Sequence, residues 1–412
     1  MPFCALLLTS FPNLDRCVWV SQQKRGAWNV LPFELLDGVK ALLEQLEGSG
    51  DVVVQTIARL RLVNKHWCLW ATRATTILKP HLSHSPWTSV VQKFVNINTI
   101  IFKPRFMVTD YLLDKLCQFS SLTSLHFDGD SQLTIGYYKH YFTDIGRGCL
   151  GRMTTLRDLS LWGPRPDKTN DEIENLTSLT ALTRLSLDLD PTLGDEGLRS
   201  LANLITLKEL DLKAHYEWRT TDRGFQHMTR LTSLTRLHLK SFNTILDEGA
   251  RSLASLIALK DLDFEYCSRI TDAGLQHFTS LTSLTRLCLR NLSEITDESA
   301  ISLASLIALK DLDLGFCKIT DVGLQHMMSL TSLTKLCLQY CEKIRDEGAS
   351  SLASLIALKD LNLGYCKEIT DVALQHLTSL TSLTRLSLED CGKITNEGAN
   401  SLASSLALKV IR

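Results

Sequence analysis

Cysteine and histidine are the side chains of this chain best suited to catalysis or metal binding, and both recur at fixed spacing. Five cysteines hold one slot of a repeated phrase: Cys267, Cys317, Cys341, Cys366 and Cys391. Four Gln-His pairs recur about every 50 residues, and their histidines are His227, His277, His326 and His376. Across two strand spacings, successive histidines would lie about 10 Å apart. That is too far to share a metal ion with ligand bonds of about 2 Å, so we expect surface histidines and no metal site.

Catalytic motifs are missing from the sequence as well. It lacks the patterns of phosphate loops, dinucleotide sites, zinc proteases and serine hydrolases. We therefore expect a non-catalytic protein that needs no cofactor. The formal net charge of −1 gives no basic footprint for nucleic acid or an anionic membrane. No segment approaches the ~20 apolar residues of a membrane span.

The cysteine content indicates a compartment. The chain has 12 cysteines, and its first residues lack the basic and long apolar regions of a secretory signal. Unpaired thiols are typical of a reducing compartment. We expect the protein to be cytoplasmic, nuclear or both.

A phrase of the form Leu-x-x-Leu-x-Leu recurs about every 25 residues, which predicts a solenoid of stacked units. Twelve copies begin at Ile97, Leu122, Leu156, Leu182, Leu207, Leu234, Leu259, Leu284, Leu309, Leu333, Leu358 and Leu383, and a shortened thirteenth begins at Leu408. The alternating leucines predict a short strand with apolar residues pointing inward. Later in each unit, spacing such as that of Leu324 and Met327 predicts a helix, which Thr320 or Asp321 would cap.

The repeated unit resembles the cysteine-containing subclass of leucine-rich repeats, in which an Ile-Thr-Asp segment such as Ile319–Asp321 follows the cysteine. The resemblance covers most of the chain and is closest from Leu259 onward. It implies an α/β solenoid, a leucine-rich-repeat horseshoe whose parallel strands line the concave face over residues 97–412. In that subclass the cysteine is a buried structural side chain.

The third position of the predicted strands alternates between acid and base. This stripe, here called the charge ladder, consists of Asp158, Arg184, Glu209, Arg236, Asp261, Arg286, Asp311, Lys335, Asp360 and Arg385. Two interpretations stay open. The stripe is either a recognition surface for a zwitterionic partner or a structural ladder that neutralises itself, with little energy in each exposed pair. The target-binding candidates within it are Arg236, Asp261, Arg286 and Asp311.

Two units are longer than their neighbours, and their extra residues are rich in aromatic side chains. The unit from Leu122 contains Tyr137, Tyr138, Tyr141 and Phe142, and the unit from Leu207 contains Tyr216 and Trp218. Insertions in repeat proteins become loops on one face, and tyrosine and tryptophan dominate binding hot spots. We expect these residues to bind a target, unless they fold back over the irregular early repeats. A further aromatic stripe either extends the surface or packs locally: Tyr266, Phe316, Tyr340 and Tyr365.

The residues before the repeats show a different pattern, with Pro32 at a predicted helix start and a second amphipathic stretch that ends near Trp67. This segment, 28–80, resembles an F-box, a small all-α domain. The matching residues are Leu31, Pro32, Glu34, Leu35, Leu36, Val63, Lys65 and Trp67. The distance from Pro32 to Trp67 is longer than usual in that family, and Asn64 stands where cysteine is common. The alternative is a helical cap for the first repeat.

The F-box resemblance, placed before leucine-rich repeats, implies the substrate-recognition subunit of an SCF-type cullin-RING ubiquitin ligase. Residues 1–27 would be an extension and 81–96 a linker or cap. A Skp-type adaptor, and through it a cullin, would dock on the F-box, and the repeats would hold a protein target. The residues that this assigns to the adaptor are Leu31, Pro32, Leu35, Leu36, Val39, Val63 and Trp67. The alternatives are a free-standing repeat scaffold and a small-ligand sensor.

Overall fold

The computed structural model describes residues 76–78, 95–102, 109–127, 144–161, 169–188, 194–213, 219–406 and 409–411. The predicted F-box (28–80) and the aromatic insertions with Tyr137, Tyr138, Tyr141, Phe142, Tyr216 and Trp218 lie outside these residues, apart from 76–78. Among the described residues, no helix has the length and apolar character that a membrane crossing requires.

The chain divides into two compact units, residues 1–101 with 118–122, and residues 102–117 with 123–412. In the first unit the described residues contain β1 (Ile77–Leu78) and most of β2 (Thr99–Phe102). These strands pair in parallel, with Ile77 opposite Thr99. The Ser121 hydroxyl donates to the carbonyl of Ile97 at 2.7 Å, which ties the start of β2 to the turn after the next helix.

The second unit repeats a strand followed by a helix along its described length. Its strands are β3 (Ser124–Phe127), β4 (Asp158–Leu161), β5 (Arg184–Asp188), β6 (Glu209–Lys213), β7 (Arg236–Lys240), β8 (Asp261–Asp263), β9 (Arg286–Cys288), β10 (Asp311–Asp313), β11 (Lys335–Cys337), β12 (Asp360–Asn362), β13 (Arg385–Ser387) and β14 (Lys409–Ile411). Its α-helices are α6 (Asp110–Leu116), α7 (Asp144–Gly151), α8 (Thr169–Leu176), α9 (Asp195–Leu201), α10 (Asp222–His227), α11 (Asp247–Leu253), α12 (Asp272–Leu275), α13 (Asp297–Leu303), α14 (Asp321–His326), α15 (Asp346–Leu352), α16 (Asp371–Leu377) and α17 (Asn396–Leu406). Three 3-10 segments extend helices: η3 (Met228–Arg230), η4 (Gln276–Ser280) and η5 (Met327–Ser329).

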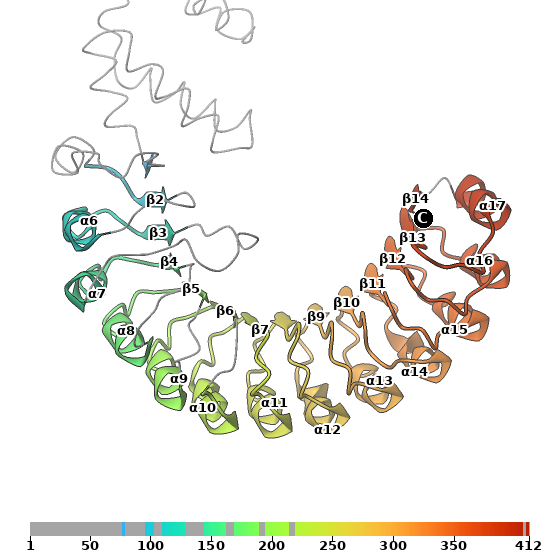
Figure 1. The fold of residues 1–412 in the computed structure, drawn as a ribbon, viewed down its shortest axis with the longest axis horizontal. Coiled ribbons are helices and arrows are strands. Elements are labelled where there is room, and N and C mark those ends of the chain that lie inside the picture. The colour runs from blue at the N-terminus through green and yellow to red at the C-terminus, as the bar shows by residue number, and fades with distance from the viewer. Residues whose placement is uncertain are drawn as a thin grey trace, which may run out of the picture. The chain divides into compact units, whose positions relative to one another are not determined.

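Strands β3 to β14 pair in chain order, each parallel to the next. Within this unit the strands line the inner side of an arc and the helices its outer side (Figure 1). Alternate strand residues face opposite ways: in β4, Leu159 and Leu161 are buried, whereas Asp158 and Ser160 are partly exposed. The core is therefore a layer of leucines between sheet and helices, which confirms the predicted parallel-strand solenoid.

The last strand corrects one detail of the predicted repeat. Val410 in β14 pairs with Leu386, the second leucine of its phrase. The thirteenth copy therefore begins one residue before Leu408, and the leucine spacing at the end of the chain was misleading. This register places Lys409 opposite Arg385.

Successive repeats are joined at the helix N-termini by an aspartate and a threonine, here called the aspartate clamp. The aspartate opens a helix, and the threonine before the next helix donates both its backbone N–H and its hydroxyl to that carboxylate. The N–H to oxygen distances are 2.7–2.9 Å and the hydroxyl distances 2.6–2.8 Å. The pairs are Asp195–Thr221, Asp247–Thr271, Asp272–Thr296, Asp297–Thr320, Asp346–Thr370 and Asp371–Thr395.

The clamp threonines also cap their own helices. The Thr320 hydroxyl accepts from the N–H of Val322, which confirms Thr320 as the cap. Asp321 instead accepts from the backbone N–H of Arg345 in the next repeat. The clamp also explains why glycine stands two residues after the first aspartate of a helix such as α14. A Cβ at Gly323 would collide with the carboxylate oxygen of Asp297 in the preceding repeat. Ser299 holds this slot in α13 and donates its hydroxyl to Asp272.

The cysteine slot is structural, as predicted. Each of its five thiols donates to a backbone carbonyl of the preceding repeat, over 2.9–3.3 Å. Burial raises the pKa of the thiols of Cys267, Cys317, Cys341 and Cys366. None of the described cysteines forms a disulfide.

We predict that Asp297→Ala lowers the free energy of unfolding by about 1–3 kcal/mol, because the N–H and hydroxyl of Thr320 both lose their acceptor. Urea unfolding followed by circular dichroism measures this change. The control is Glu298→Ala, which alters an exposed carboxylate in the same helical turn. Equal destabilisation by the two variants would show that the clamp does not stabilise the repeat.

Candidate functional site

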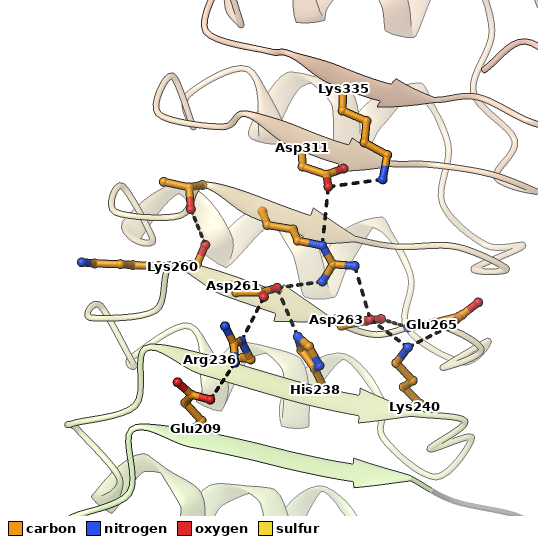
Figure 2. Close-up of polar contacts among 12 residues, drawn as sticks. Glu209, Arg236, His238, Lys240, Lys260, Asp261, Asp263, Glu265, Asp311 and Lys335 are labelled. Atoms are coloured by element: carbon orange, nitrogen blue, oxygen red, sulfur yellow. Dashed lines mark hydrogen bonds and ion pairs between the residues drawn. The ribbon is translucent and has the colours of Figure 1, made fainter. Parts of the chain in front are cut away.

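The charge ladder forms one row on the inner face of the sheet, because the strands pair in register. Asp261 lies between Arg236 and Arg286 in the sheet, and Asp311 lies between Arg286 and Lys335. The register thus brings together the four predicted target-binding residues of the ladder, Arg236, Asp261, Arg286 and Asp311. Figure 2 shows Arg236, Asp261 and Asp311 in this row.

An unbroken chain of ion pairs runs from Glu209 to Lys335. Arg236 bridges two carboxylates, with Nη1 at 2.6 Å from Glu209 Oε2 and Nε at 3.2 Å from Asp261 Oδ2. Arg286 bridges the next two, with Nη1 at 2.8 Å from Asp261 and Nε at 3.6 Å from Asp311. Lys335 Nζ ends the run at 3.5 Å from Asp311.

Two further pairs belong to the same row outside this run. Arg184 Nη2 lies 2.6 Å from Asp158 Oδ2, and Arg385 Nη1 lies 3.0 Å from Asp360 Oδ2. The acid–base alternation ends at Lys409, which pairs with Arg385 in the sheet. The ladder therefore neutralises itself along most of its length and turns basic at β13 and β14.

Cations and anions of the ladder differ in exposure. The side chains of Arg184, Arg236, Arg286, Lys335 and Arg385 are 37–56% exposed. Their acidic partners Asp158, Glu209, Asp261, Asp311 and Asp360 are only 14–32% exposed. The carboxylates lie beneath the guanidinium and ammonium groups, so this face presents mainly charged hydrogen-bond donors.

A second row of polar residues lies two positions further along the strands, and the sequence analysis did not single it out. Its central members are Asp211, His238, Asp263, Cys288, Asp313 and Cys337. Asp263 is 1% exposed. Its carboxylate accepts from the N–H of Glu265 at 2.9 Å and lies 3.3 Å from Lys240 Nζ (Figure 2). The sequence does show an acid at this position in every second strand, but the more regular charge ladder beside it is the clearer pattern.

The surroundings of Asp261 favour its charged form. Burial alone would raise the pKa of this carboxyl, but His238 and Arg286 together lower it to about 2. His238 Nε2 lies 3.2 Å from Asp261 Oδ1 without the alignment of a hydrogen bond, so the contact acts through charge when the imidazole is protonated. Asp211 shows the opposite balance, because burial raises the pKa of its carboxyl despite the nearby His238.

The second row offers no reactive thiol. Burial, followed by the charge of Asp263, raises the pKa of Cys288. Burial likewise raises the pKa of Cys337 to about 11. Within the part of the chain that the structure describes, no cluster of His, Cys, Asp and Glu side chains has the arrangement of a metal site.

The predicted aromatic stripe separates into two parts. Phe316, Tyr340 and Tyr365 stack with ring centroids 4.2 and 4.0 Å apart, and Arg290 lies over the first ring at 5.1 Å. Tyr266 stands apart from this stack and is 50% exposed. The three stacked rings pack mainly against one another, which favours the local-packing interpretation for them.

The histidines of the Gln-His pairs lie at the surface, as predicted. His277, His326 and His376 are exposed and His227 is partly exposed. At the second insertion only the last residue is described: Arg219 is exposed and forms an isolated parallel bridge with Gly194.

Known proteins that match this chain contain the same kind of repeat. The family described as "Leucine Rich repeat" matches residues 230–254, 308–328, 329–353 and 379–403. A comparison with curated proteins returns no match.

Among solved structures, an internalin (InlF) from Listeria monocytogenes is similar with a TM-score of 0.56 and 23% identity, over 90% of this chain and 96% of that chain. A chain of the yeast Rad7 and Elc1 complex is similar with a TM-score of 0.55 and 16% identity, over 97% of each chain. At these identities the likeness concerns the fold, and the chain carries leucine-rich repeats.

We predict that Asp261→Asn destabilises the protein in a pH-dependent way. The pKa of Asp261 falls from 3.8 to about 2 on folding. At a pH above the pKa of the unfolded state, the ionised carboxylate therefore stabilises the folded protein. This stabilisation is lost as the pH falls through the pKa of the folded state. The difference in free energy of unfolding between wild type and Asp261→Asn should therefore shrink between about pH 5 and pH 2.

Urea midpoints measured across this pH range test the prediction. Glu298→Gln, at an exposed carboxylate on α13, serves as the control. A difference for Asp261→Asn that stays constant with pH would contradict the assigned charge interactions.

Proposed function

We propose that this leucine-rich-repeat protein is a target receptor: its inner face binds a polypeptide, and its N-terminal segment attaches that target to a ubiquitin ligase. The observation that carries the first half is the exposure pattern of the charge ladder. A row of half-exposed cations above less exposed carboxylates is suited to a partner with carboxylates and backbone carbonyls, because both accept charge-assisted hydrogen bonds.

The self-pairing of the ladder affects how such a partner binds. Arg236 and Arg286 already have carboxylate partners, so a further carboxylate on a binding partner gains little free energy from them. Each such contact therefore adds little to affinity and more to the orientation and choice of the partner. Tight binding would need apolar anchors in addition. The aromatic insertions at 137–142 and 215–219 stay the predicted source of those anchors.

The ligase half of the proposal rests on residues 28–80 and their resemblance to an F-box. We infer that Leu31, Pro32, Leu35, Leu36, Val39, Val63 and Trp67 bind a Skp-type adaptor that recruits a cullin. The repeats would then hold the target close to the ubiquitin-transferring partner, and a raised effective concentration would favour the reaction. No residue of this chain would need to carry out bond chemistry.

The yeast likeness is compatible with this arrangement. The similar chain belongs to a complex of two proteins, Rad7 and Elc1, so a fold of this kind occurs together with a second chain. The other candidate function is a repeat scaffold that binds its target without an adaptor. The ion-paired inner face fits both functions equally, so the adaptor distinguishes them.

We predict that the full-length chain, co-expressed with a Skp-type adaptor, co-elutes with it in size-exclusion chromatography. Leu35→Asp should abolish co-elution, because it places a charge in the apolar face of the predicted helix. A free-standing scaffold would elute without the adaptor in both forms.

The control for this experiment is the integrity of the repeats. Leu35→Asp should leave the thermal unfolding of the repeats unchanged. If the variant binds the adaptor as well as wild type does, the F-box assignment is wrong, and the segment is a cap.

We predict that Arg286→Gln weakens target capture by about fivefold or more, because it removes the cation that bridges two carboxylates on the inner face. The set of proteins retained from a cell lysate, quantified by mass spectrometry, gives the readout. Captured targets should also be lost as ionic strength rises.

The matched control is Lys318→Gln. Lys318 is 52% exposed and pairs with Glu294 at 3.3 Å in the turns that follow the strands, away from the ladder. Retention of the same proteins by both variants at equal levels would show that the ladder has a structural role only.

A further inference from the structure

A second surface lies along the turns that lead from each helix into the next strand. Since the strands are parallel and in register, all these turns lie along the same edge of the sheet. Every second turn carries an isoleucine followed three residues later by a lysine. This surface, here called the Ile-Lys edge, consists of Ile205 and Lys208, Ile257 and Lys260, Ile307 and Lys310, and Ile356 and Lys359.

The isoleucines of the Ile-Lys edge are exposed although leucines beside them are buried. Their exposure is 57%, 64%, 64% and 61% along the chain. Leu256 and Leu259, on either side of Ile257, are 1% and 0% exposed. The turn conformation therefore directs the leucines into the core and each isoleucine into solvent, at four equivalent places. A recurrent row of this kind differs from the single exposed apolar residues that are normal on protein surfaces.

The lysines of the edge are exposed and lack the pairing found elsewhere on the repeats. Lys208, Lys260, Lys310 and Lys359 are exposed, and none makes an ion pair with another described residue. The turns that enter β6 to β13 contain no Asp or Glu: 202–208, 231–235, 254–260, 281–285, 304–310, 330–334, 353–359 and 378–384. The acid that follows each lysine, such as Asp261, is engaged in the charge ladder.

The opposite turns, which follow the strands, provide a contrast. There lysines pair with acids of the preceding repeat: Lys318–Glu294 at 3.3 Å, Lys367–Glu342 at 3.1 Å and Lys393–Glu368 at 2.7 Å. The inner face is paired in the same way. The Ile-Lys edge is thus a surface of the repeats where apolar side chains and unpaired positive charge coincide.

The spacing of the edge matches the repeat of an α-helix. Strands β6, β8, β10 and β12 follow at intervals of two strands, so their entry turns lie about 10 Å apart. Seven residues of an α-helix rise about 10.5 Å. Over the three intervals from Ile205 to Ile356 the two periods drift apart by only about 3 Å, which is less than the length of a side chain.

We propose that the Ile-Lys edge binds an acidic amphipathic helix of a partner protein, laid along the edge with one apolar residue per heptad on each isoleucine. Acidic residues on both sides of that apolar line would pair with the four lysines. Four contact points in a single row along the edge suit an elongated helix, whereas a lipid surface is better matched by charges spread over a plane. This surface is separate from the charge ladder, so the inference stands apart from the proposed target binding.

The test uses a fluorescein-labelled synthetic peptide of four heptads. Each heptad has leucine at the first position, glutamate at the fourth and fifth, and alanine elsewhere. A second peptide has the same composition with its leucines spaced so that they do not align, and a third has glutamine in place of glutamate. Fluorescence anisotropy with the full-length protein gives the affinities, and circular dichroism reports whether the peptide gains helix on binding.

The protein variants copy residues that the chain itself uses in the alternate turns. Thr282 and Thr285 hold the slots that Ile257 and Lys260 hold, so threonine is compatible with this turn. We expect the double variant Ile257→Thr with Ile307→Thr to weaken binding of the first peptide by about tenfold. Lys260→Thr with Lys310→Thr should weaken binding and reduce its salt dependence. Ile301→Thr on α13, at an isoleucine 52% exposed away from the edge, should have no effect.

Several outcomes would overturn the proposal. These are no binding of the first peptide, equal binding of the peptide with misaligned leucines, and equal loss on Ile301→Thr. Sedimentation with phosphatidylserine vesicles provides the remaining comparison. If vesicles bind the protein more tightly than the peptide does, and the isoleucine variants abolish that binding, the edge is a membrane contact and the helix proposal fails.

Discussion

The geometry of this protein depends on the aspartate clamp. A short parallel strand of three residues, such as β10, makes too few hydrogen bonds to hold its neighbour firmly. At six of the described junctions between repeats, the clamp adds two hydrogen bonds to one carboxylate on the helix side. The aspartate also lies at a helix N-terminus, where negative charge is favourable. Adjacent repeats are therefore joined at two separate places, by strand pairing in the sheet and by the clamp at the helix N-termini. The strands thus keep the register that aligns the charge ladder.

The turns that follow strands β7 to β13 add a local strain that neighbouring repeats offset. Seven non-glycine residues there adopt a positive φ, among them Tyr266, Phe316, Tyr340 and Tyr365. Bulky residues resist this conformation by about 1–2 kcal/mol. It lets their N–H groups donate to the next repeat, as from Tyr340 to Gly364 at 2.9 Å. The cysteine that follows donates its thiol to the preceding repeat, so these two adjacent residues bond the turn to both neighbours.

The sequence predicted the repeats, the alternating strands and the row of alternating charges, because each depends on periodicity alone. The burial of the cysteines followed from the resemblance to the cysteine-containing repeat subclass. It did not predict the clamp, since the Thr-Asp pair was interpreted within one helix, whereas its main bonds join two repeats. The second polar row was missed for a related reason: Asp263 pairs with Lys240 of the neighbouring strand, which only the strand register brings close. The register of β14 was mispredicted by one residue because Leu408 offered a misleading leucine. The F-box and the aromatic insertions lie outside the described residues and stay predictions.

The net charge is −1, but the charges are distributed unevenly over the surface. This distribution determines where the binding of a partner is favourable. On the inner face and in the turns after the strands, acids and bases from adjacent repeats neutralise each other in place. A partner there must compete with ion pairs that already exist, so its gain is limited to the exposed side of each cation. In the turns that enter β6 to β13 no acid is present, and the lysines next to the exposed isoleucines make no ion pair with another described residue. Within the described repeats, the Ile-Lys edge is thus a surface where a partner obtains both apolar burial and contact with lysines that no described acid pairs.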